Sequence, residues 1–97
     1  MSDYLETRRQ AIADIDMEIL ALLRKRLDLA VEIGHYKAEH GMEVLNPGVQ
    51  DRVIARYRKA AEELGLDPDR CETICRTVME ESIAYESAII SEAKKNE

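Results

Sequence analysis

The feature of the sequence that most constrains the fold is one helical pattern about 37 residues long, from about Asp3 to about His40. The pattern opens with the capping sequence Asp3-x-x-Glu6 and ends at Gly41. Such a helix is roughly 55 Å long, whereas a compact chain of about 100 residues has a radius of gyration of roughly 13 Å. One end of the helix must therefore project beyond its own domain.

The apolar face of this helix continues along nearly its whole length. A long apolar face that its own chain cannot cover needs a second chain to cover it. We therefore expect an obligate, intertwined homodimer. The face consists of Leu5, Ile12, Ile15, Ile19, Leu22, Leu23, Leu29, Ala30 and Ile33.

Two shorter helices follow. The second begins at Asn46-Pro47 and ends at Gly65, and the third begins at Asp67-Pro68 and ends at about Lys94. Each start pairs an N-cap side chain with a proline in the first helical position, which is a typical beginning of a helix. No strand-like alternation competes with this pattern. The sequence predicts an all-α fold of three helices, with residues 1–97 as a single domain.

Composition and charge exclude several classes of function. The formal net charge of −6 argues against nucleic-acid binding, which needs a basic surface. The longest apolar runs are about five residues, too short for a membrane span, and the acidic N-terminus does not resemble a signal peptide. We therefore expect a cytoplasmic protein. Cys71 and Cys75 lack further ligands nearby, so we interpret them as buried reduced thiols and expect no metal site.

Three cations interrupt or border the apolar face of the long helix. Arg26 occupies the heptad position held elsewhere by Ile19 and Ile33, and Arg9 and Lys37 flank the same face. Buried cations are costly unless they meet an anion, so internal salt bridges are the simplest interpretation of any one of them. Three cations on one face of an acidic protein instead favour an anion-binding site.

The spacing of these cations limits which of them can share a ligand. Arg26 and Lys37 are three helical turns apart, at roughly 16 Å along the axis, and lie on one face. Arg9 lies roughly 25 Å from Arg26 along the axis. It can contribute to the same site only from an antiparallel partner subunit.

A second anomaly lies on the third helix, where Ser82 and Glu86 fall one turn apart on an apolar stripe. A carboxylate facing a core either pairs with a cation or stays protonated. Glu86 can therefore pair with Lys37 or Arg26 to stabilise the fold, or donate a hydrogen bond to a ligand oxygen. The apolar members of the stripe are Cys71, Cys75, Val78, Met79, Ile83, Ile89, Ile90 and Ala93.

Together these stretches resemble the type II, all-α chorismate mutases, and the likeness covers nearly the whole chain. The spacing Arg9…Arg26…Lys37 within one long helix is its most specific part, and the Asn46-Pro47 helix start belongs to it as well. The similar stretches are Arg9 with Ile12-x-x-Ile15-Asp16, Ile19-Leu20-Ala21-Leu22-Leu23-x-x-Arg26, and Leu29-Ala30-Val31-Glu32-Ile33-Gly34-x-x-Lys37.

The resemblance implies a function and a set of site residues. The reaction would be the cofactor-free Claisen rearrangement of chorismate to prephenate, in the shikimate pathway leading to phenylalanine and tyrosine. Arg26 and the partner's Arg9 would bind the two carboxylates of chorismate. Lys37 would lie near the ether oxygen with Glu86 opposite, and Ser82 would line the pocket. Because a glutamate donates only when protonated, we expect activity to fall as the pH rises.

The start of the second helix departs from the bacterial family pattern, which often reads Asp-x-x-Arg-Glu. The corresponding positions here are Asn46, Val49 and Gln50. We assign Asn46 and Gln50 to substrate binding. Gln50 can still hydrogen-bond a substrate hydroxyl, but Val49 cannot replace an arginine. This departure leaves three alternatives open: an isochorismate pyruvate-lyase, a 4-amino-4-deoxychorismate mutase, and an inactive helical dimer that regulates or docks to another enzyme.

Overall fold

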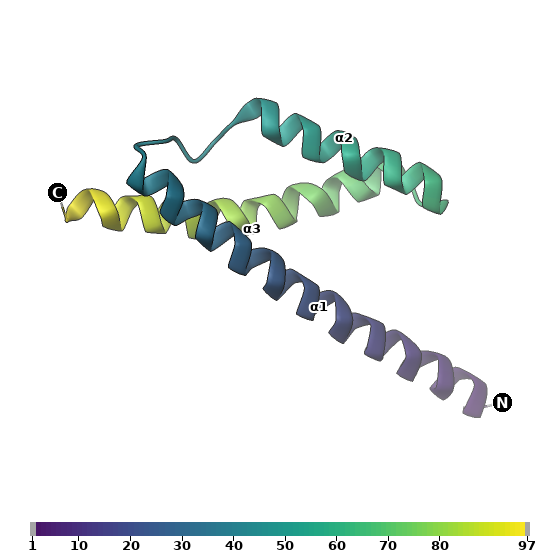
Figure 1. Cartoon of the computed structure of the whole chain (residues 1–97). Coiled ribbons are helices and arrows are strands. Elements are labelled where there is room, and N and C mark those ends of the chain that lie inside the picture. Colours follow the sequence, from purple (N-terminus) through teal and green to yellow (C-terminus); the bar gives the residue numbers. More distant parts are fainter. Residues whose placement is uncertain (1, 97) are drawn as a thin grey trace.

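The computed structural model describes residues 2–96 and contains three helices (Figure 1). They are α1 (Ser2–Glu39), α2 (Pro47–Leu64) and α3 (Pro68–Lys95). No strand occurs among these residues. The predicted all-α fold of three helices is therefore confirmed, with one very long N-terminal helix.

The predicted capping residues fix the ends of α2 and α3. The Asn46 Oδ1 atom accepts a hydrogen bond from the Val49 amide at 3.2 Å, and the Asp67 Oδ1 atom accepts from the Asp69 amide at 2.8 Å. These bonds satisfy backbone donors that the first turn of a helix cannot pair. Gly65 ends α2 in the left-handed region, with a φ of 72°.

Gly41 ends α1, as the sequence predicts. Its φ is 63°, and the Met42 amide, one residue on, donates to the Lys37 carbonyl at 2.9 Å. The proposed N-cap at Asp3 is wrong, because Asp3 lies within the first turn of α1. An acidic side chain in that turn is favourable for a different reason, since it faces the positive end of the helix dipole.

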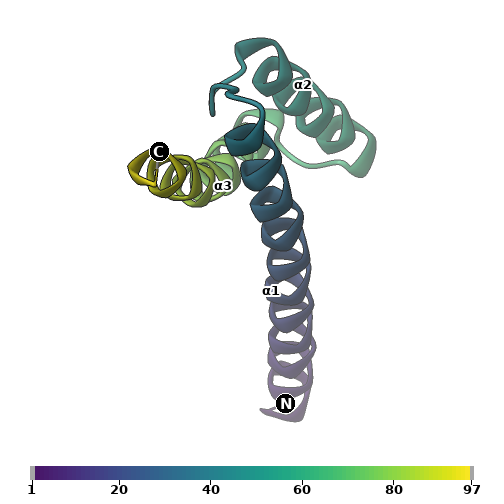
Figure 2. The ribbon, with the colours of Figure 1, turned by 60° about the vertical axis from the view of Figure 1, so that its left-hand side comes forward.

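The helix α3 packs against both of the others (Figure 1). It runs back along α2, whereas α1 crosses it and continues away from the other two helices (Figure 2). Within residues 2–96, α1 and α2 make no close backbone contact. The described chain therefore holds together through α3.

The core lies along the predicted stripe of α3. Cys75, Met79 and Ile90 are buried there, and so are the polar side chains of Ser82 and Glu86. Burial raises the pKa of the Cys75 thiol by desolvation, as expected for a neutral thiol in the core. The prediction for the other cysteine is only partly correct. Cys71 is also free, but it is half-buried because it lies near the start of α3, at the edge of the core.

The part of α1 that contacts α3 is a row of small residues, of which Ala30 belongs to the predicted apolar face. Ala30 and Gly34 are buried, one helical turn apart, and half-buried Ala38 continues their row. Leu29 and Ile33, which also belong to that face, are 61% and 50% exposed in the single chain. Small side chains allow the two helices to approach closely. The larger side chains therefore lie beside the contact instead of within it.

The N-terminal half of α1 projects from the rest of the chain (Figures 1 and 2). Every residue from 3 to 25 is exposed, including Ile12 and Ile19 of the apolar face. The radius of gyration is 17.5 Å, well above the roughly 13 Å of a compact chain of this size. Within residues 2–96, no helix is both long and apolar enough to cross a membrane.

Candidate active site

A pocket of about 490 Å³ lies where the three helices converge. Its polar wall contains six of the seven site residues predicted from the sequence: Arg26, Lys37, Asn46, Gln50, Ser82 and Glu86. The rest of the wall is apolar, apart from the backbone, and consists of Leu29, Ala30, Ile33, Met42, Val44, Val49, Val53, Met79 and Ile83. A largely apolar wall with a few convergent polar groups is typical of a small-molecule site.

Arg26 meets a neutral partner in this pocket. Its Nη1 atom donates to the Ser82 Oγ atom at 2.5 Å, and the Ser82 hydroxyl lies 3.4 Å from the Val78 carbonyl oxygen. Within residues 2–96 no carboxylate pairs with Arg26. The internal salt bridge considered for Arg26 is therefore not formed, and its positive charge is available to an anion.

Lys37 and Glu86 form the most buried ion pair within residues 2–96. The Lys37 Nζ atom lies 2.9 Å from the Glu86 Oε1 atom, and the two side chains are 16% and 9% exposed. Lys37 also donates to the Val44 carbonyl at 2.8 Å. An ammonium has three N–H donors, so these two bonds leave one N–H group for a ligand.

The segment that leads into α2 forms one side of the pocket. The Asn46 Oδ1 atom is used as the N-cap, so the Nδ2 group is the part of this side chain left for a ligand. Gln50 is half-buried and presents an amide to the pocket, and Val49 adds an apolar surface. The departure from the bacterial pattern at these positions therefore falls on the pocket wall.

The structure does not bring Arg9 to this pocket. Arg9 lies on the projecting half of α1, and its guanidinium pairs with Glu6 at 3.3 Å. The side chains of this pair are 67% and 73% exposed, so the pair contributes little to stability. In the single chain, the site therefore lacks one of its predicted cations.

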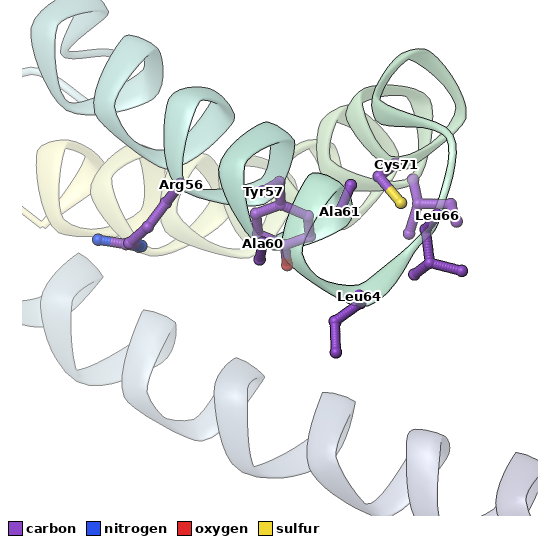
Figure 3. Close-up of a pocket in the computed structure, with 8 residues that line it drawn as sticks. Arg56, Tyr57, Ala60, Ala61, Leu64, Leu66 and Cys71 are labelled. Atoms are coloured by element: carbon purple, nitrogen blue, oxygen red, sulfur yellow. The ribbon is translucent and has the colours of Figure 1, made fainter.

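A second hollow lies at the C-terminal end of α2, against the start of α3 (Figure 3). Its wall is mostly carbon and includes Ala60, Ala61, Leu64 and Leu66, with Arg56 at one side. It has no cluster of acidic, basic or nucleophilic groups comparable with that around Lys37. Within residues 2–96, no three histidine, cysteine or acidic side chains are grouped to hold a metal ion.

Sequence reasoning missed the Val44 carbonyl, which accepts a hydrogen bond from Lys37. A backbone acceptor has no residue signature, so no pattern in the sequence could have identified it. The sequence feature most closely related to this contact is Gly41, which ends α1. A residue in the left-handed region turns the chain back on itself at the end of α1, and Val44 follows three residues later.

Comparison with known proteins places the chain in a family. Residues 8–87 match the family of type II chorismate mutases, and the chain belongs to that family. The matched range includes Arg9 at one end and Glu86 at the other. The family resemblance inferred from the spacing of the three cations is thereby confirmed.

Three relatives illustrate the range of the likeness. The T-protein of Enterobacter agglomerans is 39% identical over 83 residues, which are 86% of this chain and 22% of that protein. The T-protein of Haemophilus influenzae is 32% identical over 85 residues, 88% of this chain and 22% of that protein. The 4-amino-4-deoxychorismate mutase of Streptomyces venezuelae is 29% identical over 87 residues, 90% of this chain and 84% of that protein. The chain thus spans about a fifth of the length of the two T-proteins.

Proposed function

We propose that this chain catalyses the Claisen rearrangement of chorismate to prephenate, without a cofactor, in the biosynthesis of phenylalanine and tyrosine in the cytoplasm. The observation that carries the proposal is the pocket in which Arg26, Lys37 and Glu86 converge, in a chain of the type II chorismate mutase family. A unimolecular pericyclic reaction needs no nucleophile or base. It needs a compact substrate conformer and a donor at the oxygen where charge develops.

Arg26 is suited to binding a carboxylate of the substrate. Its guanidinium is held by a neutral hydroxyl, so a bidentate carboxylate contact would complete its pairing without breaking a salt bridge. Lys37 is suited to the ether oxygen, because its one remaining N–H is fixed in direction by Glu86 and the Val44 carbonyl. A fixed charged donor of this kind contributes about 3 kcal/mol to transition-state stabilisation, or about two decades in rate.

A second copy of the chain would complete the site. Arg26 and Lys37 together with the Glu86 carboxylate give the pocket one net positive charge, whereas chorismate has two carboxylates. A further cation is needed, and we assign it to the partner's Arg9. Two observations support this homodimer: the apolar face on the projecting half of α1 is exposed, with Ile12 at 58% and Leu22 at 63%, and Arg9 lies on that same half.

The test is the loss of chorismate absorbance with purified protein, with the product identified by chromatography. We expect wild type to form prephenate, and Arg26→Ala to lower kcat/KM by about two orders of magnitude or more. Arg24→Ala is the matched control and should remain active, because Arg24 is exposed and pairs with Asp28 on the surface of α1. Absence of prephenate with wild type would refute the proposal.

A second candidate is the rearrangement of 4-amino-4-deoxychorismate. A relative of that name aligns along 84% of its own length, and the pocket has Val49 and Gln50 where many bacterial members of the family have arginine and glutamate. The same assay with the amino analogue and with isochorismate separates the alternatives. A higher kcat/KM for the amino analogue favours this mutase, and pyruvate release from isochorismate favours a lyase. No turnover of any of the three favours the docking module.

A further inference from the structure

Gly34 lies at a close approach of α1 to α3. A Cβ atom added at this position would lie 3.2 Å from the Cα atom and 3.3 Å from the Cγ atom of Glu86. It would also lie 3.1 Å from the Cδ1 atom of Ile89. These separations are shorter than ordinary contacts between carbon atoms, which lie near 3.5–4.0 Å. Gly34 is buried and does not have a positive φ, so the need for glycine here is the space it leaves and not its backbone conformation.

The two neighbours would respond differently to a methyl group at Gly34. The Cδ1 atom is the far end of the Ile89 side chain and can rotate aside. The Cα atom of Glu86 belongs to the backbone of α3, so it moves only if the helix moves. A side chain at Gly34 would therefore displace the segment of α3 that contains Glu86 by a few tenths of an ångström.

That segment determines the geometry of the Lys37–Glu86 pair. Lys37 follows Gly34 by three residues and so lies on the same face of α1. Its Nζ atom meets the Glu86 Oε1 atom at 2.9 Å, almost out of contact with solvent. The backbone contact at Gly34 thus sets the separation of the two helices at the point where each contributes one member of the pair.

We propose that Gly34 is a positioning residue, which fixes the distance between α1 and α3 so that Glu86 aligns the Lys37 ammonium toward the reacting substrate. The proposal rests on the proposed mutase function. Gly34 itself touches neither the pocket nor a ligand, since it is not part of the pocket wall. Its effect on the rate is exerted through Glu86.

The kinetic test compares Gly34→Ala with wild type at saturating and limiting chorismate. We expect kcat to fall at least about tenfold, because sub-ångström misplacement of a catalytic group is costly, while KM changes less than about threefold. The double variant Gly34→Ala/Ile89→Val removes the Cδ1 contact but leaves the Glu86 backbone contact, and it should remain impaired. It is also the variant to assay if Gly34→Ala alone fails to fold. A kcat near the wild-type value in either variant would overturn the proposal.

A double-mutant cycle tests whether Gly34 acts through Glu86. In a Glu86→Ala background, adding Gly34→Ala should lower kcat by less than about twofold, because the group that it positions is already absent. If the two losses multiply instead, Gly34 acts by another route and the proposal fails.

If wild type turns over no chorismate, the proposed function fails first, and the inference is then decided by stability. The Lys37–Glu86 coupling can be measured from the unfolding equilibria of Lys37→Met, Glu86→Gln and the double variant. We expect the coupling constant between Lys37 and Glu86 to fall at least about threefold when Gly34→Ala is present. An unchanged coupling would contradict the positioning role.

Discussion

Arg26 and Lys37 are held in the pocket in different ways. Arg26 donates to the hydroxyl of Ser82, which has no charge to neutralise it. Lys37 lies between the Glu86 carboxylate and the Val44 carbonyl. A mobile ammonium would lose rotational freedom on meeting a substrate, whereas this one is already fixed. The difference matches the proposed roles, in which Arg26 attracts the anion and Lys37 presents a preorganised donor.

The Lys37–Glu86 pair is not explained by stability alone. Buried ion pairs are often no more stabilising than apolar side chains of similar volume, because both charges must leave water. A chain that needed only a stable contact between α1 and α3 could place aliphatic residues here, as it does with Met79 and Ile90 along the same face. The polar pair is therefore better explained by a function in the pocket.

Replacing Glu86 by glutamine tests how Glu86 holds Lys37. The Glu86 Oε1 atom accepts from the Lys37 ammonium at 2.9 Å, and the amide oxygen of a glutamine can accept the same hydrogen bond. We expect Glu86→Gln to keep more of the wild-type kcat than Glu86→Ala, because only the glutamine still positions the ammonium. Steady-state kinetics of the two variants measures the difference.

The control is Glu80→Gln, at an exposed residue on α3, which should keep the wild-type kcat. An equal loss of kcat in Glu86→Gln and Glu86→Ala would contradict a role of the Glu86 hydrogen bond in positioning Lys37.

At the scale of the elements, α3 connects the site to the rest of the fold. Its buried face contains Cys75 and Met79 on one side of Ser82 and Glu86, and Ile90 on the other. The apolar residues fix the position of the helix, and the two polar residues between them face the pocket. A change that loosens α3 should therefore affect the site as well as stability.

Glu72 links α2 to α3 and gives a prediction on pH and stability. Its carboxylate accepts from Arg76 on α3 at 2.8 Å and from Arg58 on α2 at 3.1 Å. Hydrogen bonding from Arg76, supported by Arg58, lowers the pKa of Glu72 in the folded chain. The ionised form thus stabilises the fold above the pKa of the unfolded chain, and this contribution is lost as the pH falls through the lower folded pKa.

Glu72→Gln should therefore lower Tm at pH 7 by a few degrees at most, because the pair is partly exposed to solvent. The difference from wild type should shrink once the pH falls below about 4. Thermal unfolding followed by circular dichroism at pH 7 and at low pH measures both effects, with Glu80→Gln as the control. A deficit that stays constant at low pH would contradict the assigned cause.

Much of the fold could be predicted from a few residues. Asn46 and Asp67, each followed by proline, predicted the starts of α2 and α3, because the N-cap bond is a local interaction. The contact of α1 with α3 could not be predicted beyond Ala30, because hydrophobic periodicity does not single out small residues such as Gly34 and Ala38. Their small size allows the two helices to approach closely.

The sequence predicted which residues belong to the site better than it predicted which of their side chains pair with one another. Position on a helix face singled out Arg26, Lys37, Ser82 and Glu86. The family resemblance implied that they share one pocket, and all four line it. Which cation meets Glu86 was left open, because Lys37 and Arg26 lie on one face and only the crossing point of the helices decides between them. The Val44 carbonyl could not be predicted, since backbone acceptors depend on the path of a loop.

The whole molecule has a shape that is difficult to explain for a single chain in water. The described residues extend over 64 × 26 × 14 Å, and the half of α1 that projects exposes a continuous apolar face. Helical stability in proteins comes mainly from packing of such a face, so the projecting half needs a partner to remain helical. The apolar hollow beside Ala60 and Leu64 is a second uncovered surface on the same chain (Figure 3). The second copy of the chain that we propose would cover the projecting half of α1 and supply the further cation that the pocket needs.

The most direct test of this account is complementation between two inactive variants. Arg9→Ala and Lys37→Ala should each lose most chorismate mutase activity, and Arg8→Ala, the adjacent exposed arginine, should retain it. When the two inactive variants are unfolded together and refolded as a 1:1 mixture, half of the dimers pair one chain of each kind. Each mixed dimer then contains one intact site, which has Lys37 from one chain and Arg9 from the other, so activity should recover to about a quarter of wild type. A mixture as inactive as its components, although light scattering shows dimers, would contradict a site shared between two subunits.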